Sequence, residues 1–415
     1  MNFKENLLTY LDADFVDDLL VSMQKDRTNC LILNTNKMDD ETFIKMFPKV
    51  RPHSFINHAY FYDKNDYDFG KSFYFDNGLF YIMDSASMVV PYLLPINDNE
   101  NVLDMCAAPG GKSICLVLKN CSINLISNDI NYQRCCTLSS SIEKMGFSNV
   151  IVSCSTISLL ENYYKNTFEK IVLDAPCSGS AMFRKNEEIK KDWSYEKVLR
   201  CQKEQKVLLK QAASMLKDGG ILSYSTCSFS YEENEEVIVD FLTENKNFEA
   251  IYIENDPSFV RGINLPQAIH LFPNKYEGEG QFVCLLKKNG QLKGSKNYVP
   301  VGTFNHSERI NDKLYLYNNN LNLKSLNVLR KGLLKCIYKG NVEIPSFHYA
   351  HYLDSKNSIK LSEIEAKKYL HGEEIMKDIN LENGYHVVSY QNLNLGYIHK
   401  VGNKLKNLYP KGLRH

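Results

Sequence analysis

Two cysteines that each follow a short apolar run could do chemistry in this chain. Cys177 lies in Asp174-Ala-Pro-Cys-Ser-Gly179, and Cys227 lies in Tyr224-Ser-Thr-Cys-Ser228. Upstream, Val102-Leu-Asp-Met-Cys-Ala-Ala-Pro-Gly-Gly-Lys-Ser113 has the pattern of a strand, a glycine turn and the start of a helix. A thiolate is a good nucleophile, and a glycine turn before a helix can hold a nucleotide-type cofactor. Together these segments suit covalent methyl transfer to a pyrimidine.

The glycine turn differs from the common phosphate-binding loops. Gly110-Gly111-Lys112-Ser113 is similar to the end of a P-loop, but that motif needs a glycine where this chain has Cys106, and no GxGxxG is present. ATP hydrolysis and NAD chemistry are therefore poor fits. The segment is instead a tight turn followed by a helix, and the backbone amides at the helix N-terminus can bind a carboxylate such as that of S-adenosylmethionine. The expected cofactor-binding residues are Cys106, Ala107, Ala108, Pro109, Gly110, Gly111, Lys112, Asp129 and Asp174.

The elements that must position these motifs alternate between strands and helices. The clearest helical pattern covers residues 195–217, before Gly219-Gly220, and a strand over 281–287 is expected to close the sheet. This alternation predicts an α/β fold with a parallel, doubly wound, Rossmann-like sheet, in which ligands bind at the carboxyl ends of the strands. Every motif above falls at such an end. The expected strands cover residues 102–105, 125–129, 150–153, 171–174 and 221–225.

Charge is distributed unevenly although the net charge is zero. From Leu285 onward there are 21 Lys and Arg against 10 Asp and Glu, whereas residues 1–284 have 28 against 39. Because RNA affinity comes largely from cations that neutralise phosphates, we expect RNA to contact the basic C-terminal part. No apolar run approaches a membrane span, and the twelve cysteines show no CxxC spacing. We expect a soluble, cytoplasmic protein without a disulfide scaffold, membrane contact or metal.

Several motifs together resemble one enzyme family. The turn motif with Asn128-Asp129, the Asp174 and Cys227 motifs, and Glu232-Glu-Asn-Glu235 are similar to the Nol/Nop/Sun family of RNA C5-cytosine methyltransferases. His270-Leu-Phe-Pro273 and the tail Val401 to Arg414 resemble its bacterial RsmF (YebU) branch. That branch modifies small-subunit (16S) ribosomal RNA and carries a PUA-like C-terminal module. The resemblance implies S-adenosylmethionine as cofactor and RNA, as ribosomal RNA or the ribosomal subunit, as partner.

The resemblance also assigns roles that position alone leaves open, since DNA cytosine methyltransferases attack with the Pro-Cys cysteine. It implies that Cys227 is the nucleophile that adds to cytosine C6 and that Cys177 helps release the product. Asp174 would hold the N3/N4 edge of the base and assist protonation. Lys112 would favour the thiolate through its charge.

Five regions are expected along the chain. Residues 1–90 form an accessory domain and 91–287 the methyltransferase domain. Residues 288–301 form a linker, 302–375 a helical module and 376–415 the PUA-like, β-rich RNA-binding module.

Departures from the family pattern leave alternatives open. Met83 precedes Asp84 where relatives often have Gln, and Cys154-Ser-Thr156 provides no recognisable adenine partner. The family's Ser-Gly-Glu-Gly-Met-Phe-Arg-Lys reads Ser178-Gly-Ser-Ala-Met-Phe-Arg-Lys185. The same chemistry on transfer RNA, or an inactive RNA-binding ribosome-assembly factor, therefore remains an alternative.

Overall fold

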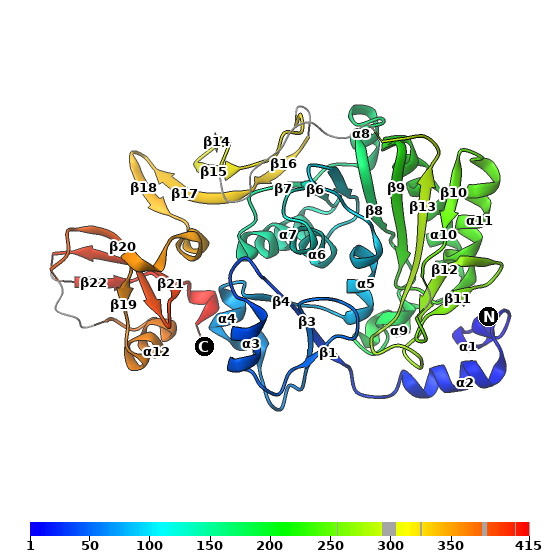
Figure 1. Cartoon of the computed structure of the whole chain (residues 1–415), viewed down its shortest axis with the longest axis horizontal. Helices are drawn as coiled ribbons and strands as arrows, with labels where there is room; N and C mark the ends of the chain where they lie inside the picture. The colour runs from blue at the N-terminus through cyan, green and yellow to red at the C-terminus, as the bar shows by residue number, and fades with distance from the viewer. Residues whose placement is uncertain (255, 293–303, 324–325, 376–379, 403, 415) are drawn as a thin grey trace.

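A ten-stranded mixed sheet forms the centre of the protein in a computed structural model (Figure 1). The structure describes residues 1–254, 256–292, 304–323, 326–375, 380–402 and 404–414. The sheet order is β11-β12-β13-β9-β8-β5-β6-β7-β16, with β10 paired to β13. Its strands are β5 (Asn101–Asp104), β6 (Asn124–Asn128), β7 (Val150–Ser153), β8 (Phe168–Asp174), β9 (Leu216–Thr226), β10 (Phe248–Ile251), β11 (Val260–Gly262), β12 (Leu265–Leu271), β13 (Gln281–Lys288) and β16 (Val328–Lys331).

Five neighbouring strands run parallel, in the spatial order β7, β6, β5, β8 and β9. Strand β13 pairs antiparallel with β9 and closes the sheet. Successive side chains of a strand point to opposite faces, so Val102 packs in one buried cluster and Leu103 in another. Helices cover both faces, which confirms the predicted doubly wound α/β fold. These helices are α5 (Ser85–Leu93), α6 (Gly111–Lys119), α7 (Tyr132–Met145), α8 (Ile157–Tyr163), α9 (Glu187–Asp192), α10 (Tyr195–Met215) and α11 (Glu235–Glu244).

The N-terminal region begins with two helices and continues into a small antiparallel sheet that carries two further short helices. The first two helices lie beside the β11–β12 end of the large sheet, while the small sheet lies below the α5 side (Figure 1). Leu7, Val16 and Leu19 pack with Ala181 and Phe229 of the catalytic domain. The elements are α1 (Phe3–Leu7), α2 (Ala13–Ser22), β1 (Asn29–Leu33), α3 (Asp40–Met46), β2 (Arg51–Pro52), β3 (Ala59–Tyr62), α4 (Phe73–Asp76) and β4 (Phe80–Ile82).

The expectation of a helical module over 302–375 is wrong, because most of the regular structure there is β. Leu314 and Leu316 alternate with tyrosines along β15, a period of two that fits a strand paired on both sides. Among the described residues of this range, 304–323 and 326–375, the single α-helix has nine residues. The elements are β14 (His306–Ile310), β15 (Lys313–Tyr317), β16, β17 (Leu333–Lys339), β18 (Val342–Pro345), β19 (Ile359–Lys360) and α12 (Glu363–His371).

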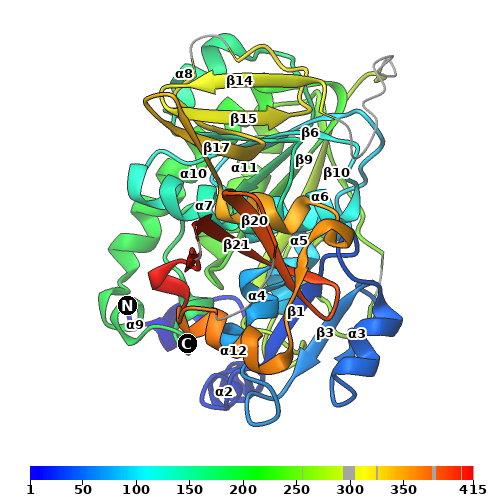
Figure 2. The ribbon, with the colours of Figure 1, turned by 90° about the vertical axis from the view of Figure 1, so that its left-hand side faces the viewer.

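The C-terminal β-rich prediction agrees with the structure, in which β20 (Gly384–Tyr390), β21 (Leu393–Val401) and β22 (Lys404–Asn407) form a sheet with β19. Figure 2 shows β20 and β21 in front of the N-terminal domain and the sheet of β14, β15 and β17 above them. Tyr409 donates a hydrogen bond to Asp76 at 3.0 Å, which joins the C-terminal region to the N-terminal domain. The expected linker over 288–301 falls largely on residues 293–303, outside the described residues.

Candidate active site

The two motif cysteines meet at the carboxyl ends of neighbouring parallel strands. Asp174 at the end of β8 pairs in register with Ser225 of β9, so the loops that follow leave the sheet side by side. The Sγ atoms of Cys177 and Cys227 lie 3.1 Å apart, and both thiols are free and partly exposed. The structure therefore places two sulfurs in contact, 50 residues apart in sequence.

The environment of Cys177 favours its protonated form. Its hydrogen bond to Cys227 and its burial raise the pKa of the Cys177 thiol well above the usual range, and Glu233 and Asp174 add to the effect. A thiol that keeps its proton can donate it to the neighbouring sulfur. Cys177 therefore favours its thiol form while in direct contact with the Cys227 sulfur.

Asp174 is held by three different elements. Its carboxylate accepts hydrogen bonds from Lys112 Nζ at 2.7 Å, Ser225 Oγ at 2.8 Å and Gln281 Nε2 at 3.1 Å. Burial pushes the pKa of Lys112 down, but the adjacent Asp174 carboxylate outweighs this effect and the net pKa is raised. Lys112 therefore remains a cation, and Cys227 is close enough to interact with its charge.

Glu233 joins the loops that carry the two cysteines, a role that the sequence did not reveal. Its carboxylate accepts the backbone N–H of Ser178 at 2.8 Å, the hydroxyls of Ser178 and Ser228, and Gln205 Nε2 at 3.0 Å. Ser178 and Ser228 directly follow Cys177 and Cys227. In the sequence, the only indication of this role is that a Cys-Ser dipeptide occurs in both motifs and that an acidic run follows the second one.

The acidic run Glu232-Glu-Asn-Glu-Glu236 has the pattern of a helix start, where negative charge favours the helix dipole. Glu235 and Glu236 do lie in the first turn of α11. However, Glu233 precedes the helix and is fully buried, and Glu235 contacts His270 at 2.8 Å inside the protein. The run therefore contains two buried structural carboxylates, and stabilisation of the helix dipole explains only part of it.

The expected cofactor turn follows β5, the strand at which the chain order of the sheet reverses. Gly110 has φ +114°, and a Cβ there would lie 3.0 Å from Leu138, so glycine is required. The Ala107 amide donates to Asn128 O at 2.7 Å, and Arg134 Nη2 donates to Ala108 O at 2.9 Å. These bonds hold the turn open in front of the N-terminus of α6, where backbone amides can donate hydrogen bonds to a carboxylate.

Among the expected cofactor-binding residues, Asp129 has the position of an acceptor for a ribose hydroxyl. It follows β6 and is 2% exposed. Its Oδ1 accepts the Asn131 amide at 3.0 Å, while its buried Oδ2 has Arg134 at 3.2 Å but accepts no well-aligned hydrogen bond. A buried carboxylate oxygen with free acceptor capacity suits a ligand hydroxyl. Burial raises the pKa of the Cys106 thiol above its usual range, so this residue shapes the turn in its neutral form.

Among the residues that the structure describes, no three His, Cys, Asp or Glu side chains gather as a metal-binding group. None of the described helices combines the length and apolar character needed to cross a bilayer.

The order of this sheet and the glycine turn after β5 define a Rossmann-like fold, and its structural neighbours are methyltransferases. Residues 91–287 match the family described as 16S rRNA methyltransferase RsmB/F, and residues 356–415 match the methyltransferase RsmF PUA domain. The chain therefore belongs to the RsmB/F family, which confirms the resemblance seen in its motifs. Membership of this methyltransferase family also confirms S-adenosylmethionine as the cofactor.

Curated relatives and solved structures agree with this assignment. Ribosomal RNA small subunit methyltransferase F of Vibrio parahaemolyticus is 30% identical over 73% of this chain and 66% of its own. The protein of the same name from Vibrio campbellii is 27% identical over 99% and 96%. A methyltransferase homologue from Pyrococcus horikoshii is 27% identical, with a TM-score of 0.57 over 68% of this chain and 98% of its own. NSun6 from Pyrococcus horikoshii, solved with SFG, shares the fold at 19% identity, with a TM-score of 0.60 over 70% of this chain and 98% of its own.

Proposed function

We propose that this protein methylates C5 of a cytosine in small-subunit (16S) ribosomal RNA through a covalent bond between Cys227 and C6. The observation that carries the chemistry is the contact between Cys177 and Cys227 beside Asp174. The name of the matching family and the names of the curated relatives support the RNA class. The C-terminal match to a PUA domain supports RNA binding by residues 356–415.

Cys227 supplies the nucleophile in this proposal. Its thiolate forms an S–C6 bond, the C5=C6 electron pair moves into the ring, and N3 gains a proton, which makes C5 nucleophilic. C5 then takes up the electrophilic methyl group that S-adenosylmethionine supplies, and the S–CH3 bond breaks to leave a neutral thioether. A base removes the C5 proton, the electron pair of that C–H bond re-forms C5=C6 as the S–C6 bond breaks, and N3 returns its proton to Asp174.

Asp174 and Cys177 assist the proton transfers in these steps. The Asp174 carboxylate, oriented by Lys112 and Gln281, holds the N3/N4 edge of the base and assists protonation at N3. Cys177 retains its proton beside the reacting sulfur and donates it to Cys227 as the product leaves. The base must be unstacked to reach these groups, which costs a few kcal/mol, less in single-stranded RNA.

Covalent trapping tests this mechanism. Cys177→Ala should accumulate a denaturant-stable adduct with RNA in the presence of S-adenosylmethionine, because release is impaired. The matched control is Cys177→Ala/Cys227→Ala, which should form none. An adduct that persists in the double variant would exclude Cys227 as the nucleophile. No adduct in Cys177→Ala and no activity in the wild type would support an inactive assembly factor.

Bisulfite sequencing identifies the substrate. A strain that lacks this protein should lose 5-methylcytidine at a small-subunit position, and the wild-type gene should restore it where Cys227→Ala does not. If 5-methylcytidine is lost at a transfer RNA position instead, transfer RNA is the substrate of the same reaction. If no cytosine changes in either pool, the proposed reaction is wrong.

A further inference from the structure

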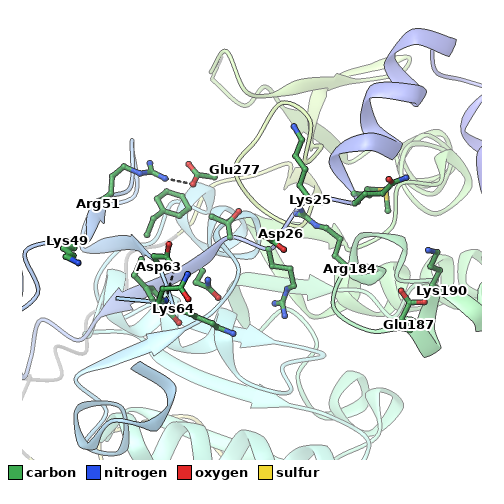
Figure 3. Close-up of a pocket in the computed structure, with 18 residues that line it drawn as sticks. Lys25, Asp26, Lys49, Arg51, Asp63, Lys64, Arg184, Glu187, Lys190 and Glu277 are labelled. Carbon is green, nitrogen blue, oxygen red and sulfur yellow. Dashed lines mark hydrogen bonds and ion pairs between the residues drawn. The ribbon is translucent and has the colours of Figure 1, made fainter. Parts of the chain in front are cut away.

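A wide polar groove lies where the N-terminal domain meets the catalytic domain. Its volume is about 960 Å³, and its lining comes from the 23–29 segment after α2, from β2 and β3 and the loop after β3, and from residues 184–190. Figure 3 shows Lys49 and Arg51 on one side of this groove and Arg184 and Lys190 on the other. Three segments far apart in sequence, together with Glu277, thus form one surface.

The charge of the groove is opposite to that of the chain around it. Seven Lys or Arg and four Asp or Glu line it, whereas residues 1–284, which include all of them, have 28 against 39. A local excess of cations in an otherwise acidic part of the molecule favours a polyanionic ligand. Phosphate groups of RNA are such a ligand.

Three lysines of the groove are available to a ligand. Lys25, Lys64 and Lys190 are exposed and have no carboxylate partner among the described residues.

Arg51 of the groove is already oriented by contacts within the protein. Arg51 pairs with Glu277, and its guanidinium lies 4.3 Å from the centre of the Phe61 ring with 57% of the side chain exposed. An exposed guanidinium plane held on an aromatic ring can stack against an unpaired base.

A short loop connects the groove to the proposed reaction centre. Glu279 binds both Arg27 at 3.3 Å and Arg184 at 3.0 Å, and Arg184 also donates to Gly278 O at 2.8 Å. Gln281, two residues further, donates to Asp174. Two residues span roughly 7 Å at most, so the edge of the groove lies close to the carboxylate that would hold the target base.

We propose that this groove binds the sugar-phosphate backbone of the single-stranded RNA segment that flanks the target cytosine. The inference rests on the proposed function and adds a second RNA-contacting surface to the basic C-terminal region. Lys25, Lys64 and Lys190 neutralise phosphates, and Arg51 stacks against one flanking base. The groove thereby holds the strand while the target base enters the site beside Cys227.

The test compares charge reversal in the groove with charge reversal elsewhere. The groove variant is Lys25→Glu/Lys64→Glu/Lys190→Glu. The matched control is Lys165→Glu/Lys203→Glu/Lys246→Glu, three exposed lysines of the catalytic domain without carboxylate partners and outside the groove. The probe is a labelled single-stranded oligoribonucleotide of about 20 nucleotides with one cytosine. Binding is measured from low to physiological salt, and thermal unfolding confirms that all variants fold.

Losing three phosphate contacts should raise the Kd of the groove variant at least tenfold at physiological salt. The slope of log K against log salt should become less steep by about 2, at about 0.7 per contact for single strands. The control variant should match the wild type. A neutral version, Lys25→Gln/Lys64→Gln/Lys190→Gln, should lie between the wild type and the reversal.

Failure of the inference differs from failure of the proposed function. Equal salt slopes for the groove variant and the wild type would reject the groove as an RNA surface, even if methyl transfer is intact. If the groove variant loses no more affinity for the oligoribonucleotide than the control variant does, the groove is rejected as an RNA surface as well. A groove variant that loses affinity while wild-type protein transfers no methyl group to any RNA would support the groove and reject the reaction.

Discussion

The backbone amide of Ser178 donates a hydrogen bond of 2.8 Å to Glu233, whose other oxygen accepts the hydroxyl of Ser228. Both serines directly follow the cysteines of the site. One buried carboxylate therefore determines the relative position of Cys177 and Cys227.

Glu233→Gln should reduce methyl transfer by about 10- to 100-fold. The amide retains the shape of the side chain but loses charge-assisted hydrogen bonds worth about 1.5–3 kcal/mol, so the two sulfurs lose their alignment. The effect should fall on kcat more than on the KM for S-adenosylmethionine. The control is Glu236→Gln on the exposed side of the same acidic run, which should behave like the wild type. Equal kinetics for Glu233→Gln and wild type would show that this carboxylate does not position the thiols.

Lys112→Met should slow methyl transfer by about 10- to 100-fold, because Asp174 loses its only cationic partner among the described residues and Cys227 loses a nearby positive charge. A second measurement separates these causes. In a Cys177→Ser background, iodoacetamide should alkylate Cys227 more slowly when Lys112 is Met. An unchanged alkylation rate would leave orientation of Asp174 as the sole role of Lys112. Lys119→Met, on the same helix, is the control for general destabilisation.

Asp104 should make stability depend on pH. Burial raises the pKa of this carboxyl to about 7, against about 3.9 in an unfolded chain, although a hydrogen bond from Ser113 opposes the shift. The folded state therefore retains the proton over this interval, and the free energy of unfolding decreases as pH rises from about 4 to 7. Thermal unfolding at several pH values should show this decrease flattened in Asp104→Asn. Parallel profiles for the two proteins would contradict the raised pKa.

Arg330 should anchor the C-terminal region to the catalytic sheet. It lies on β16, pairs with Glu143 of α7, and donates to Ser139 at 2.8 Å, with 5% of its side chain exposed. Arg330→Ala leaves Glu143 largely buried and unpaired, which should cost about 3–5 kcal/mol of unfolding free energy. Arg330→Ala/Glu143→Ala should recover part of that loss. A double variant as unstable as the sum of the two single variants would show that the pair is not coupled.

The local parts of the site could be predicted from the sequence. The turn from Cys106 to Gly111 and the strand-end positions of Asp174, Cys177 and Cys227 follow from short motifs between periodic apolar runs. Strands over 150–153 and 281–287 were predicted to within one residue, and the long helix begins at Tyr195 as expected. Such features depend on neighbours along the chain, which is why hydrophobic periodicity is sufficient to find them.

Partners from distant parts of the chain could not be predicted in this way. The helical prediction for 302–375 failed because the strands there are specified by pairing, and β16 joins the far edge of the catalytic sheet next to β7. Strand propensity depends strongly on such cross-strand context. The groove combines segments from 23–29, 49–65 and 184–190, so its excess of cations is absent from any single stretch of sequence.

The sequence by itself determined which groups are available for chemistry, since two thiols, a carboxylate, a lysine and a glycine turn stand at predicted strand ends. Only the tertiary structure decided how these groups act on one another. It places Cys177 3.1 Å from Cys227, Lys112 2.7 Å from Asp174, and Glu233 beneath both cysteine loops. The physical reason is that hydrogen bonding and charge act over a few ångströms in space, and the order of strands in the sheet determines which residues come that close.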